Sequence, residues 1–345
     1  NGVVVRHDRS TGAWILIALH DDTLGPSAGG TRMKVYPDLS DALLDVLRLA
    51  EGMTYKFAGV GLARGGGKAV LAIPRPLEPG EREGLLERYG ELVESLRGAF
   101  FTGPDLGAGP DAMNVVARRT RNIFGIDPAG GASLDPGPFT ARGVHAGLRA
   151  ALEHVFGHPD SAGRSVLIEG LGDVGDPLAR RLAEAGARLL LADLDAAKAD
   201  RLARELGGSG DVEVIPLDAV PETPCDVYAP CAVGATVNAD TIPRFRCRIV
   251  AGSANNQLRE DADAGRLHRR GIVYVPDYIG NAGGAIAFLL LHEGAGRETI
   301  DDRVAAIEGS VATILREAAE RDESPLAAAR RRVDKILAEH RDRER

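Results

Sequence analysis

Short apolar runs alternate with stretches of helical apolar spacing along the first third of the chain. A helix is predicted over 39–53, where Leu43, Leu47, Ala50 and Met53 recur at steps of three and four residues and so share one face. The apolar runs have the length of strands and lie at residues 3–5, 15–19, 69–73 and 100–101. This alternation predicts an α/β domain in which helices cover a sheet.

A cluster of turn and breaker residues over 128–138 interrupts this alternation. Two domains are expected, because 345 residues exceed what one hydrophobic core usually contains, and we place the boundary in this cluster. The first domain is predicted to comprise 1–136 and a C-terminal helical segment, at about 318–345, that packs back on it. The second domain is predicted to comprise 137–317.

The second domain has the pattern of repeated strand–helix–strand units. A helix is predicted from Thr140 to about Phe156, and strands at 165–169 and 188–193 enclose another helix. Further strands are predicted at 212–215, 226–229, 248–251 and 273–275, and further helices at 303–315 and 325–341. Strands that alternate with helices predict a parallel, Rossmann-like sheet.

Three glycines after the first of these strands match a dinucleotide-binding turn. Gly170, Gly172 and Gly175 follow an apolar strand and open a helix, and Asp193 ends the next strand. In such turns the glycines permit the tight turn, the approach of pyrophosphate to the backbone, and close helix–strand packing. The Asp193 carboxylate would bind the ribose hydroxyls and repel a 2′-phosphate, so NAD is predicted rather than NADP. Asp195 could share that role, and the alternative is that the glycines serve packing alone.

A second glycine-rich segment, Gly52–Val70, contains two lysines. It does not match a phosphate-binding loop, because Leu62 stands where that motif needs its first glycine and Ala69 where it needs a magnesium-binding hydroxyl. Lys56 and Lys68 are flanked by small and apolar residues. Burial and a neighbouring cation make a lysine give up its proton more readily, which suits a general base. The alternative is a pair of solvated lysines beside a structural turn.

Composition and charge limit the classes of partner. A formal net charge of −8 and the lack of a dominant Lys/Arg block argue against nucleic acid, so a small-molecule substrate is expected. No apolar run has the length of a membrane span and no signal peptide is visible, so a cytoplasmic location without a membrane segment is predicted. Cys225, Cys231 and Cys247 match neither a disulfide framework nor a zinc pattern, so buried thiols and no metal are expected.

Several ordered segments resemble the leucine/phenylalanine/valine branch of the glutamate dehydrogenase superfamily. The matching stretches are Leu24–Met33, Gly52–Val70, Thr102–Gly107, Gly170–Gly175, Val227–Asn238, Ala251–Gln257 and Pro276–Gly284. The resemblance implies an N-terminal α/β domain for substrate binding and oligomerisation, a C-terminal Rossmann-like domain for NAD, and a homo-oligomer. It also implies reversible oxidative deamination of an L-amino acid to its 2-oxo acid and ammonia.

Four residues take roles in this chemistry by their positions in the matching motifs. Lys56 would pair with the substrate carboxylate, and Lys68 would activate the water that attacks the iminium carbon. Asp105 would carry protons to and from the amine, and Asn256 would anchor the substrate. All four are present, which argues against a catalytically retired NAD-binding regulator; a hydroxy-acid or imine reductase on a similar scaffold is a further alternative.

The resemblance also implies contacts to substrate and cofactor. Gly29 and Gly30 would line the substrate pocket. The residues implied to face the substrate side chain are Ala28, Gly103, Ala285 and Phe288. Besides the three glycines and Asp193, the implied cofactor contacts are Asp173, Val174, Cys231, Ala232, Asn238, Ala254 and Asn255. For Asn238 a structural role is the alternative.

Recognition of the side chain in this family is apolar, and no additional lysine or arginine motif signals a glutamate substrate. Ala285 and Gly103 leave room whereas Phe288 takes room away, so phenylalanine is predicted, with the branched-chain acids leucine and valine as the alternative. Three positions depart from the family pattern and bear on specificity and hinge details: Ala108, Asn114 and Arg142.

Overall fold

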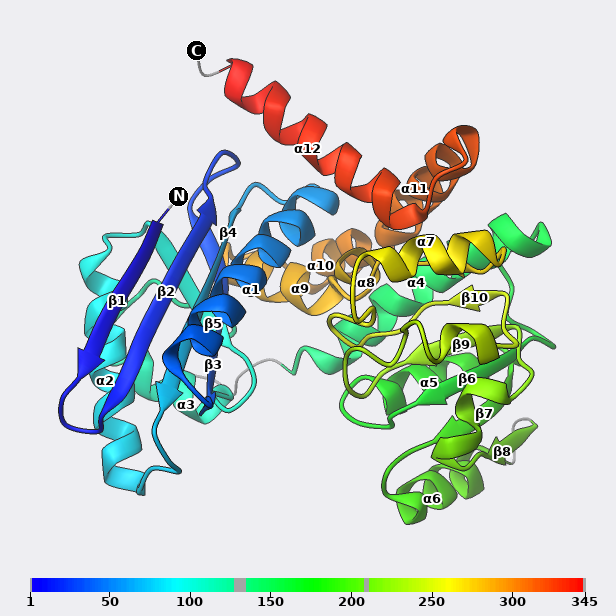
Figure 1. Cartoon of the computed structure of the whole chain (residues 1–345), viewed down its shortest axis with the longest axis horizontal. Coiled ribbons are helices and arrows are strands. Elements are labelled where there is room, and N and C mark those ends of the chain that lie inside the picture. The colour runs from blue at the N-terminus through cyan, green and yellow to red at the C-terminus, as the bar shows by residue number, and fades with distance from the viewer. Residues whose placement is uncertain (1, 127–134, 208–210, 344–345) are drawn as a thin grey trace. The chain divides into compact units, whose positions relative to one another are not determined.

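The computed structural model describes residues 2–126, 135–207 and 211–343 (Figure 1). By its contacts the chain divides into two units, which we describe separately. Unit 1 contains 1–134, 288–296 and 333–345, and unit 2 contains 135–287 and 297–332. This division differs from the predicted one at the C-terminal side, because 318–332 belong to unit 2 and 288–296 to unit 1.

Unit 1 is built on a five-stranded mixed sheet in the order β1-β2-β4-β3-β5. The strands are β1 (Gly2–Asp8), β2 (Ala13–Asp21), β3 (Ser27–Val35), β4 (Gly65–Ile73) and β5 (Phe100–Pro104). β1 and β4 run antiparallel to β2, whereas β3 runs parallel to both β4 and β5. Apolar runs predicted four of these strands. β3 was not predicted, because it consists mostly of small and polar residues and its strand conformation depends on a neighbour at either side.

Helices cover both faces of this sheet: α1 (Leu39–Gly59) lies on one, and α2 (Pro79–Ser95) and α3 (Pro110–Val116) on the other. Along β2, Leu16 packs in the core cluster of α1, and Ile15 and Ile17 pack in that of α2 and α3. Val70 of β4 also packs with α1. Because side chains alternate along a strand, Lys68, two residues before Val70, lies on the α1 face.

The buried face of α1 differs from the predicted one. The residues that it buries are Ala42, Val46, Ala50, Thr54, Phe57 and Ala58. Leu43 and Leu47, which the sequence places on one apolar face with the buried Ala50, are 37% and 43% exposed. The helix approaches β4 so closely that a Cβ added to Gly66 would lie 2.2 Å from the backbone nitrogen of Thr54. This approach requires small side chains on the facing side of α1, which turns the leucines outward.

The C-terminal half of α12 (Pro325–Arg343) belongs to unit 1 and packs there on α1, as predicted for the last helix. Val333 and Leu337 share a core cluster with Ala58. The Tyr55 hydroxyl donates to a carboxylate oxygen of Asp334 at 2.8 Å. Helix α12, like α9 (Gly283–His292), therefore contributes residues to both units.

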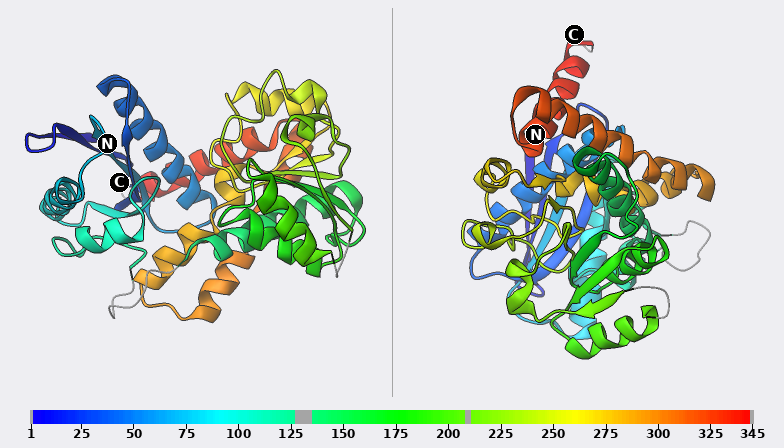
Figure 2. Two further views of the ribbon diagram at one scale, coloured as in Figure 1. Left: turned by 90° about the horizontal axis from the view of Figure 1, so that it is seen from below. Right: turned by 90° about the vertical axis from the view of Figure 1, so that its right-hand side faces the viewer.

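Unit 2 contains a six-stranded sheet in the order β11-β10-β9-β6-β7-β8, in which every pairing is parallel. Figure 2 shows the green and yellow ribbons of this unit from two further sides. The strands are β6 (Ser165–Glu169), β7 (Arg188–Ala192), β8 (Val212–Val214), β9 (Val227–Pro230), β10 (Ile249–Val250) and β11 (Val273–Tyr274). The predicted parallel sheet is confirmed. The strand order reverses between β6 and β9, which is where open α/β sheets bind their ligands at the carboxyl ends of the strands.

The helices of unit 2 connect and cover these strands. They are α4 (Gly137–Phe156), α5 (Gly175–Glu184), α6 (Ala196–Leu206), η1 (Leu217–Glu222), η2 (Ile242–Arg244), α7 (Ala262–Arg269), α8 (Asp277–Gly280), α10 (Arg297–Ala305) and α11 (Ile307–Arg321). The single helix predicted over 303–315 is wrong, because the helix breaks at Ala306 between α10 and α11. The apolar spacing stays helical across this break, so periodicity could not locate it.

Candidate active site

Lys68, in one strand of the unit 1 sheet, forms an ion pair with Asp105, which directly follows another. Lys68 lies in β4 and Asp105 directly follows β5, and the lysine Nζ lies 2.7 Å from Asp105 Oδ2. Only 9% of the Lys68 side chain and 20% of the Asp105 side chain are exposed. Strand β3 lies between β4 and β5, so the sheet topology brings these two residues together.

The Asp105 carboxyl is held in its charged form. Burial alone would raise its pKa, but the charge of Lys68, the hydrogen bond from Lys68, the charge of Arg32 and the Leu106 amide together lower the pKa to about 2. Arg32 Nε lies 3.6 Å from the same carboxylate oxygen that Lys68 contacts. A carboxylate and an amine in direct contact in a mostly buried site are suited to move protons.

Lys56 lies in the last turn of α1 and is half-buried. The helix contacts β4 at Gly66, where the side-chain position is filled by Thr54. Lys56 and Lys68 each follow this contact by two residues, one along the helix and one along the strand. The segment 52–70 is therefore the end of a helix and the start of a strand, and most of its glycines do not form a loop.

Ala28, Gly29 and Gly30 lie in β3 and are buried. A Cβ added to Gly29 would lie 1.7 Å from the Gly67 carbonyl oxygen, and one added to Gly30 would lie 2.6 Å from that of Pro104. These glycines let the backbones of β3 and its neighbours come together beside the ion pair. Ala28 is 1% exposed, so it presents almost no surface to a substrate side chain here.

The space beside Gly103 is occupied by Phe124. A Cβ added to Gly103 would lie 2.3 Å from Phe124 Cε2. The Phe124 ring centroid lies 6.2 Å from that of Phe288, and these side chains are 8% and 6% exposed. The room that Gly103 was predicted to leave for a substrate is thus filled by the protein. Ala285 lies in α9, within the part assigned to unit 2, and is half-buried.

The glycine turn in unit 2 follows β6 and begins α5, as predicted. Gly170 has a φ of +93°, and a Cβ there would lie 2.5 Å from Ala232 Cβ. A Cβ on Gly175 would lie 1.9 Å from the Gly170 carbonyl oxygen. A Cβ on Gly172 would meet no atom within 4 Å. The backbone at Gly172 is therefore open on the side where a pyrophosphate would approach it, and this turn fits a dinucleotide.

Asp193 follows β7, and its carboxylate bonds to the backbone of the glycine turn. Oδ2 accepts from the Leu171 amide at 2.7 Å, and Oδ1 accepts from the Asp195 amide at 2.9 Å. Asp195 instead caps α6, so Asp193 is the acidic residue held at the turn. Asp173 is exposed in the turn and Val174 is the N-cap of α5.

The loop after β9 begins with Cys231 and the exposed Ala232. The Cys231 amide donates to the Glu169 carbonyl at 2.7 Å, and burial raises the pKa of its thiol, so the thiol stays neutral. Asn238 is buried; its Nδ2 donates to the Ala235 carbonyl at 2.9 Å and its Oδ1 accepts from the amide two residues later. These bonds give Asn238 a part in shaping its own loop.

Ala254, Asn255 and Asn256 follow β10 in unit 2. Ala254 is buried, and Asn255 Oδ1 accepts from Asn281 Nδ2 at 2.8 Å. Asn256 is exposed with a φ of +52°, and its carbonyl accepts from the Ala235 amide at 2.7 Å. Left-handed backbone in a residue other than glycine is uncommon and clusters at functional sites.

Two of the three departures from the family pattern are explained by local contacts. Ala108 is fully buried, and its amide and carbonyl pair with those of Asp105, which fixes the turn that carries the carboxylate. Arg142 of α4 donates to Asp301 of α10, so its partner lies within unit 2. Asn114 is exposed in α3, and nothing in the structure explains it.

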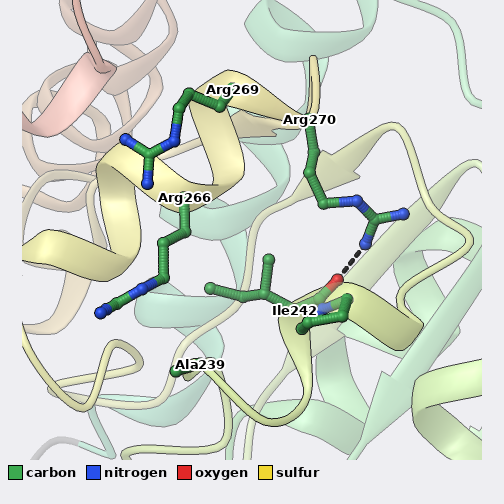
Figure 3. A pocket seen from close by; sticks show the side chains of 6 residues that line it. Ala239, Ile242, Arg266, Arg269 and Arg270 are labelled. Carbon is green, nitrogen blue, oxygen red and sulfur yellow. Dashed lines mark hydrogen bonds between the residues drawn. The ribbon is translucent and has the colours of Figure 1, made fainter.

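A cavity of about 470 Å³ in unit 2 contains none of the predicted site residues. It is lined by Ala239, Ile242, Pro243, Arg266, Arg269 and Arg270 (Figure 3). Figure 3 shows Arg270 directed at the Ile242 carbonyl, to which it donates, and Arg266 pairs with Glu260 and Asp263. Arg266 and Arg270 thus already bond to other groups of the protein.

Neither a metal site nor a membrane helix emerges from the described parts of the chain. Over residues 2–126, 135–207 and 211–343, no three His, Cys, Asp or Glu side chains are grouped so that they could hold a metal ion. Within the same ranges, no helix has both the length and the apolar character needed to cross a membrane.

Two residues that the sequence analysis did not single out lie at these sites. Arg32 is a cation within a buried strand, and Phe124 is an aromatic residue just before the domain boundary. The position of Arg32 beside two matched glycines was a signal that could have drawn attention to it. Phe124 offered none, because its contact with Gly103 exists only in the tertiary structure.

Comparison with known proteins supplies the family. Residues 5–122 match the Glu/Leu/Phe/Val dehydrogenase dimerisation domain, and residues 190–342 match the Glutamate/Leucine/Phenylalanine/Valine dehydrogenase domain. The chain is 39% identical to leucine dehydrogenase of Bacillus cereus, over 91% of this chain and 84% of that protein. It is 39% identical to phenylalanine dehydrogenase of Lysinibacillus sphaericus, over 97% of this chain and 88% of that protein.

A solved structure is similar over nearly the whole chain. L-tryptophan dehydrogenase from Nostoc punctiforme superposes with a TM-score of 0.85 at 34% identity, covering 99% of this chain and 97% of that chain. Three relatives of comparable identity thus carry three different substrate names, so identity alone does not select a side chain. The paired domains and the identity over most of the chain show that this protein belongs to the Glu/Leu/Phe/Val dehydrogenase family of amino-acid dehydrogenases.

Proposed function

We propose that the protein catalyses the reversible, NAD-dependent oxidative deamination of an apolar L-amino acid to its 2-oxo acid and ammonia. The observation that carries the proposal is the ion pair between Lys68 and Asp105. It places an amine and a charged carboxylate side by side, and these are the groups needed to activate water and to exchange protons with a leaving amine.

The proposed reaction uses these residues in order. Lys56 binds the substrate carboxylate and Asn256 anchors the substrate. Asp105 accepts a proton from the substrate ammonium, which leaves a neutral amine. After Cα is oxidised, Lys68, in its neutral form, takes a proton from the water that attacks the iminium carbon. Asp105 then returns its proton to the nitrogen, and its freed carboxylate takes the hydroxyl proton of the carbinolamine as the C–N bond breaks, which releases the 2-oxo acid and ammonia.

The glycine turn of unit 2 is the proposed NAD site. Gly170, Gly172 and Gly175 would leave room for the pyrophosphate. The Asp193 carboxylate, which accepts a hydrogen bond from the Leu171 amide, would also accept hydrogen bonds from the ribose hydroxyls. The carboxylate disfavours a 2′-phosphate, which supports NAD over NADP. Bound there, NAD supplies the acceptor for the hydride that leaves Cα.

Phenylalanine is the substrate that the sequence favours, and one observation supports a branched-chain acid instead. Phe124 fills the space beside Gly103 and lies against Phe288, so two large rings occupy part of unit 1 close to the ion pair. A smaller side chain, such as that of leucine or valine, needs less of that space. In either case the surroundings are apolar, which supports an apolar substrate.

A homo-oligomer is part of the proposal. Four leucines on α1 are exposed, namely Leu39, Leu43, Leu44 and Leu47, at 38%, 37%, 53% and 43%. An apolar stripe on one helix is a surface that a second copy of the chain could bury. The helix lies within the residues that match the dimerisation domain.

The test is ammonia-dependent oxidation of NADH with a panel of 2-oxo acids. We expect turnover with phenylpyruvate or with the 2-oxo acids of leucine and valine, and none without ammonia. Turnover without ammonia would indicate a hydroxy-acid reductase, and no turnover with any member would indicate a retired regulator. A Phe124→Ala variant compared with wild type separates the two substrates, because it should improve kcat/KM for phenylpyruvate relative to the branched-chain acids by about tenfold.

A further inference from the structure

Asp105 faces a second cation, Arg32, that the proposed reaction does not use. Arg32 Nε lies 3.6 Å from Asp105 Oδ2, the oxygen that Lys68 Nζ contacts at 2.7 Å. This nitrogen is buried, and among the described residues it has no hydrogen-bond acceptor. Its charge is therefore directed at the carboxylate at short range and away from solvent.

Arg32 is held in place at its other end. Its Nη1 lies 3.2 and 3.0 Å from the two carboxylate oxygens of Asp45 in α1, and the Tyr36 hydroxyl donates to Asp45 at 2.6 Å. Burial and the Asp45 carboxylate raise the pKa of Tyr36 well above its ordinary value, so the phenol remains a donor. The guanidinium is thus fixed between an anion in a helix and the anion of the active site.

The two cations on Asp105 differ in one chemical property. A guanidinium keeps its proton at any pH at which proteins fold, whereas an ammonium can lose its proton. In the proposed reaction Lys68 must be neutral to activate water, and the loss of its charge removes the nearest cation from Asp105. Arg32 keeps its charge, so Asp105 stays ionised until it accepts the proton of the substrate ammonium. Its positive charge also disfavours retention of the proton that Lys68 must give up.

We propose that Arg32 is a positioning residue for the Lys68–Asp105 pair. Its position is fixed by Asp45 and Tyr36. From there it holds one oxygen of Asp105 toward the protein interior and lowers the affinity of the Lys68–Asp105 pair for its proton. The inference rests on the proposed function, since that reaction requires the proton to leave.

The test is the pH dependence of kcat/KM for amino-acid oxidation in an Arg32→Gln variant. The ascending limb of the profile reports the loss of the proton that the Lys68–Asp105 pair must give up in the proposed reaction. Removing a positive charge at 3.6 Å strengthens proton binding, so the limb should move to higher pH by about one unit. Arg32→Lys keeps the charge and should restore most of the wild-type profile.

Lys34→Gln is the matched control. Lys34 lies on the same strand two residues further on, is exposed, and its Nζ lies 4.4 Å from the centre of the Tyr36 ring. The variant removes the same charge beside the same network, but from solvent, and should leave the limb in place. A limb that is unchanged in Arg32→Gln, or that moves equally in Arg32→Lys, would overturn the inference. A purely structural role would lower kcat at every pH without moving the limb.

A second variant and a measurement without turnover keep the test decisive. If Arg32→Gln does not fold, Arg32→Gln combined with Asp45→Asn removes the cation without leaving the Asp45 carboxylate unpaired, and the same upward shift is expected. A wild-type protein that turns over no amino acid contradicts the proposed function alone.

In that case the inference is tested by urea unfolding between pH 5 and pH 3. The folded pKa of Asp105 lies below its ordinary value, so the stability it contributes is present above about pH 4 and is lost as the pH falls toward 2. Arg32→Gln raises that folded pKa and should reduce this loss. An acid dependence equal to that of wild type and Lys34→Gln would contradict the inference.

Discussion

The two glycine-rich segments of this protein have similar compositions, but their glycines permit different kinds of contact. In residues 170–175 a strand, a turn and a helix follow one another, so the glycines act on their immediate neighbours in the chain. In residues 52–70 the glycines are divided between the end of a helix and a central strand, and Gly66 contacts Thr54 of that helix. The role of the glycines in the first segment can be inferred from their spacing in the sequence. In the second segment their role depends on the packing of α1 on β4.

The comparison also separates two kinds of site. The proposed NAD turn is contiguous, and the distant Asp193 accepts a hydrogen bond from its Leu171 amide. The proposed proton-transfer site joins Lys68 of β4 with Asp105 after β5, across β3. Substitutions in 170–175 should therefore act locally, whereas those in 52–70 should act through tertiary contacts.

The largest effect is expected for Lys68→Ala. Loss of a general base should lower kcat for amino-acid oxidation by about 10² to 10⁴. Steady-state kinetics with the preferred amino acid measures this, with the exposed Lys335→Ala as the control. A variant with near-wild-type kcat would contradict the role of Lys68.

A large effect on stability is expected for Gly66→Ala. The added Cβ would lie 2.2 Å from Thr54 N and 2.6 Å from the Ala50 carbonyl oxygen, so α1 and β4 must separate. Such overpacking costs about 1–3 kcal/mol of the free energy of unfolding, measured by urea denaturation.

Gly52→Ala is the matched control within the same segment. Gly52 lies in α1, and a Cβ there would meet nothing within 4 Å. Alanine should stabilise the helix by about 0.5–1 kcal/mol. Equal losses in both variants would show that the glycines of this segment are required for flexibility instead of for close packing.

A selective effect on cofactor binding is expected for Gly172→Ala. The protein has space for the methyl group, so the free energy of unfolding should change by less than about 0.5 kcal/mol. The same methyl would stand where the pyrophosphate approaches, so the Kd for NADH should rise by about tenfold, as titration calorimetry can measure. A variant that unfolds more easily but binds NADH as wild type does would reverse this assignment.

The smallest effect concerns the pH dependence of stability. The pKa of Asp105 is lowered to about 2, so its contribution is present above about pH 4 and declines as the pH falls toward 2. Asp105→Asn removes this titrating group. Between pH 5 and pH 3 the free energy of unfolding of the variant should therefore fall by about 1 kcal/mol less than that of wild type. Denaturant midpoints at both pH values test this, and parallel declines would show that Asp105 is not the titrating group.

The sequence by itself determined the features that depend on neighbours in the chain. Alternating strand and helix patterns predicted the parallel sheet of unit 2, because most strands there are contiguous apolar runs. The glycine turn and Asp193 were located by spacing for the same reason. The family was identified from ordered motifs, which the comparisons confirmed.

Only the tertiary structure decided which side chains meet. β3 is a strand because β4 and β5 supply its hydrogen bonds, and its residues are too small and polar to signal one. The outward leucines of α1 and the ring of Phe124 beside Gly103 follow from close backbone approach, which periodicity does not encode. Arg32 faces Asp105 for the same reason, since strands far apart in sequence become neighbours only when the sheet forms.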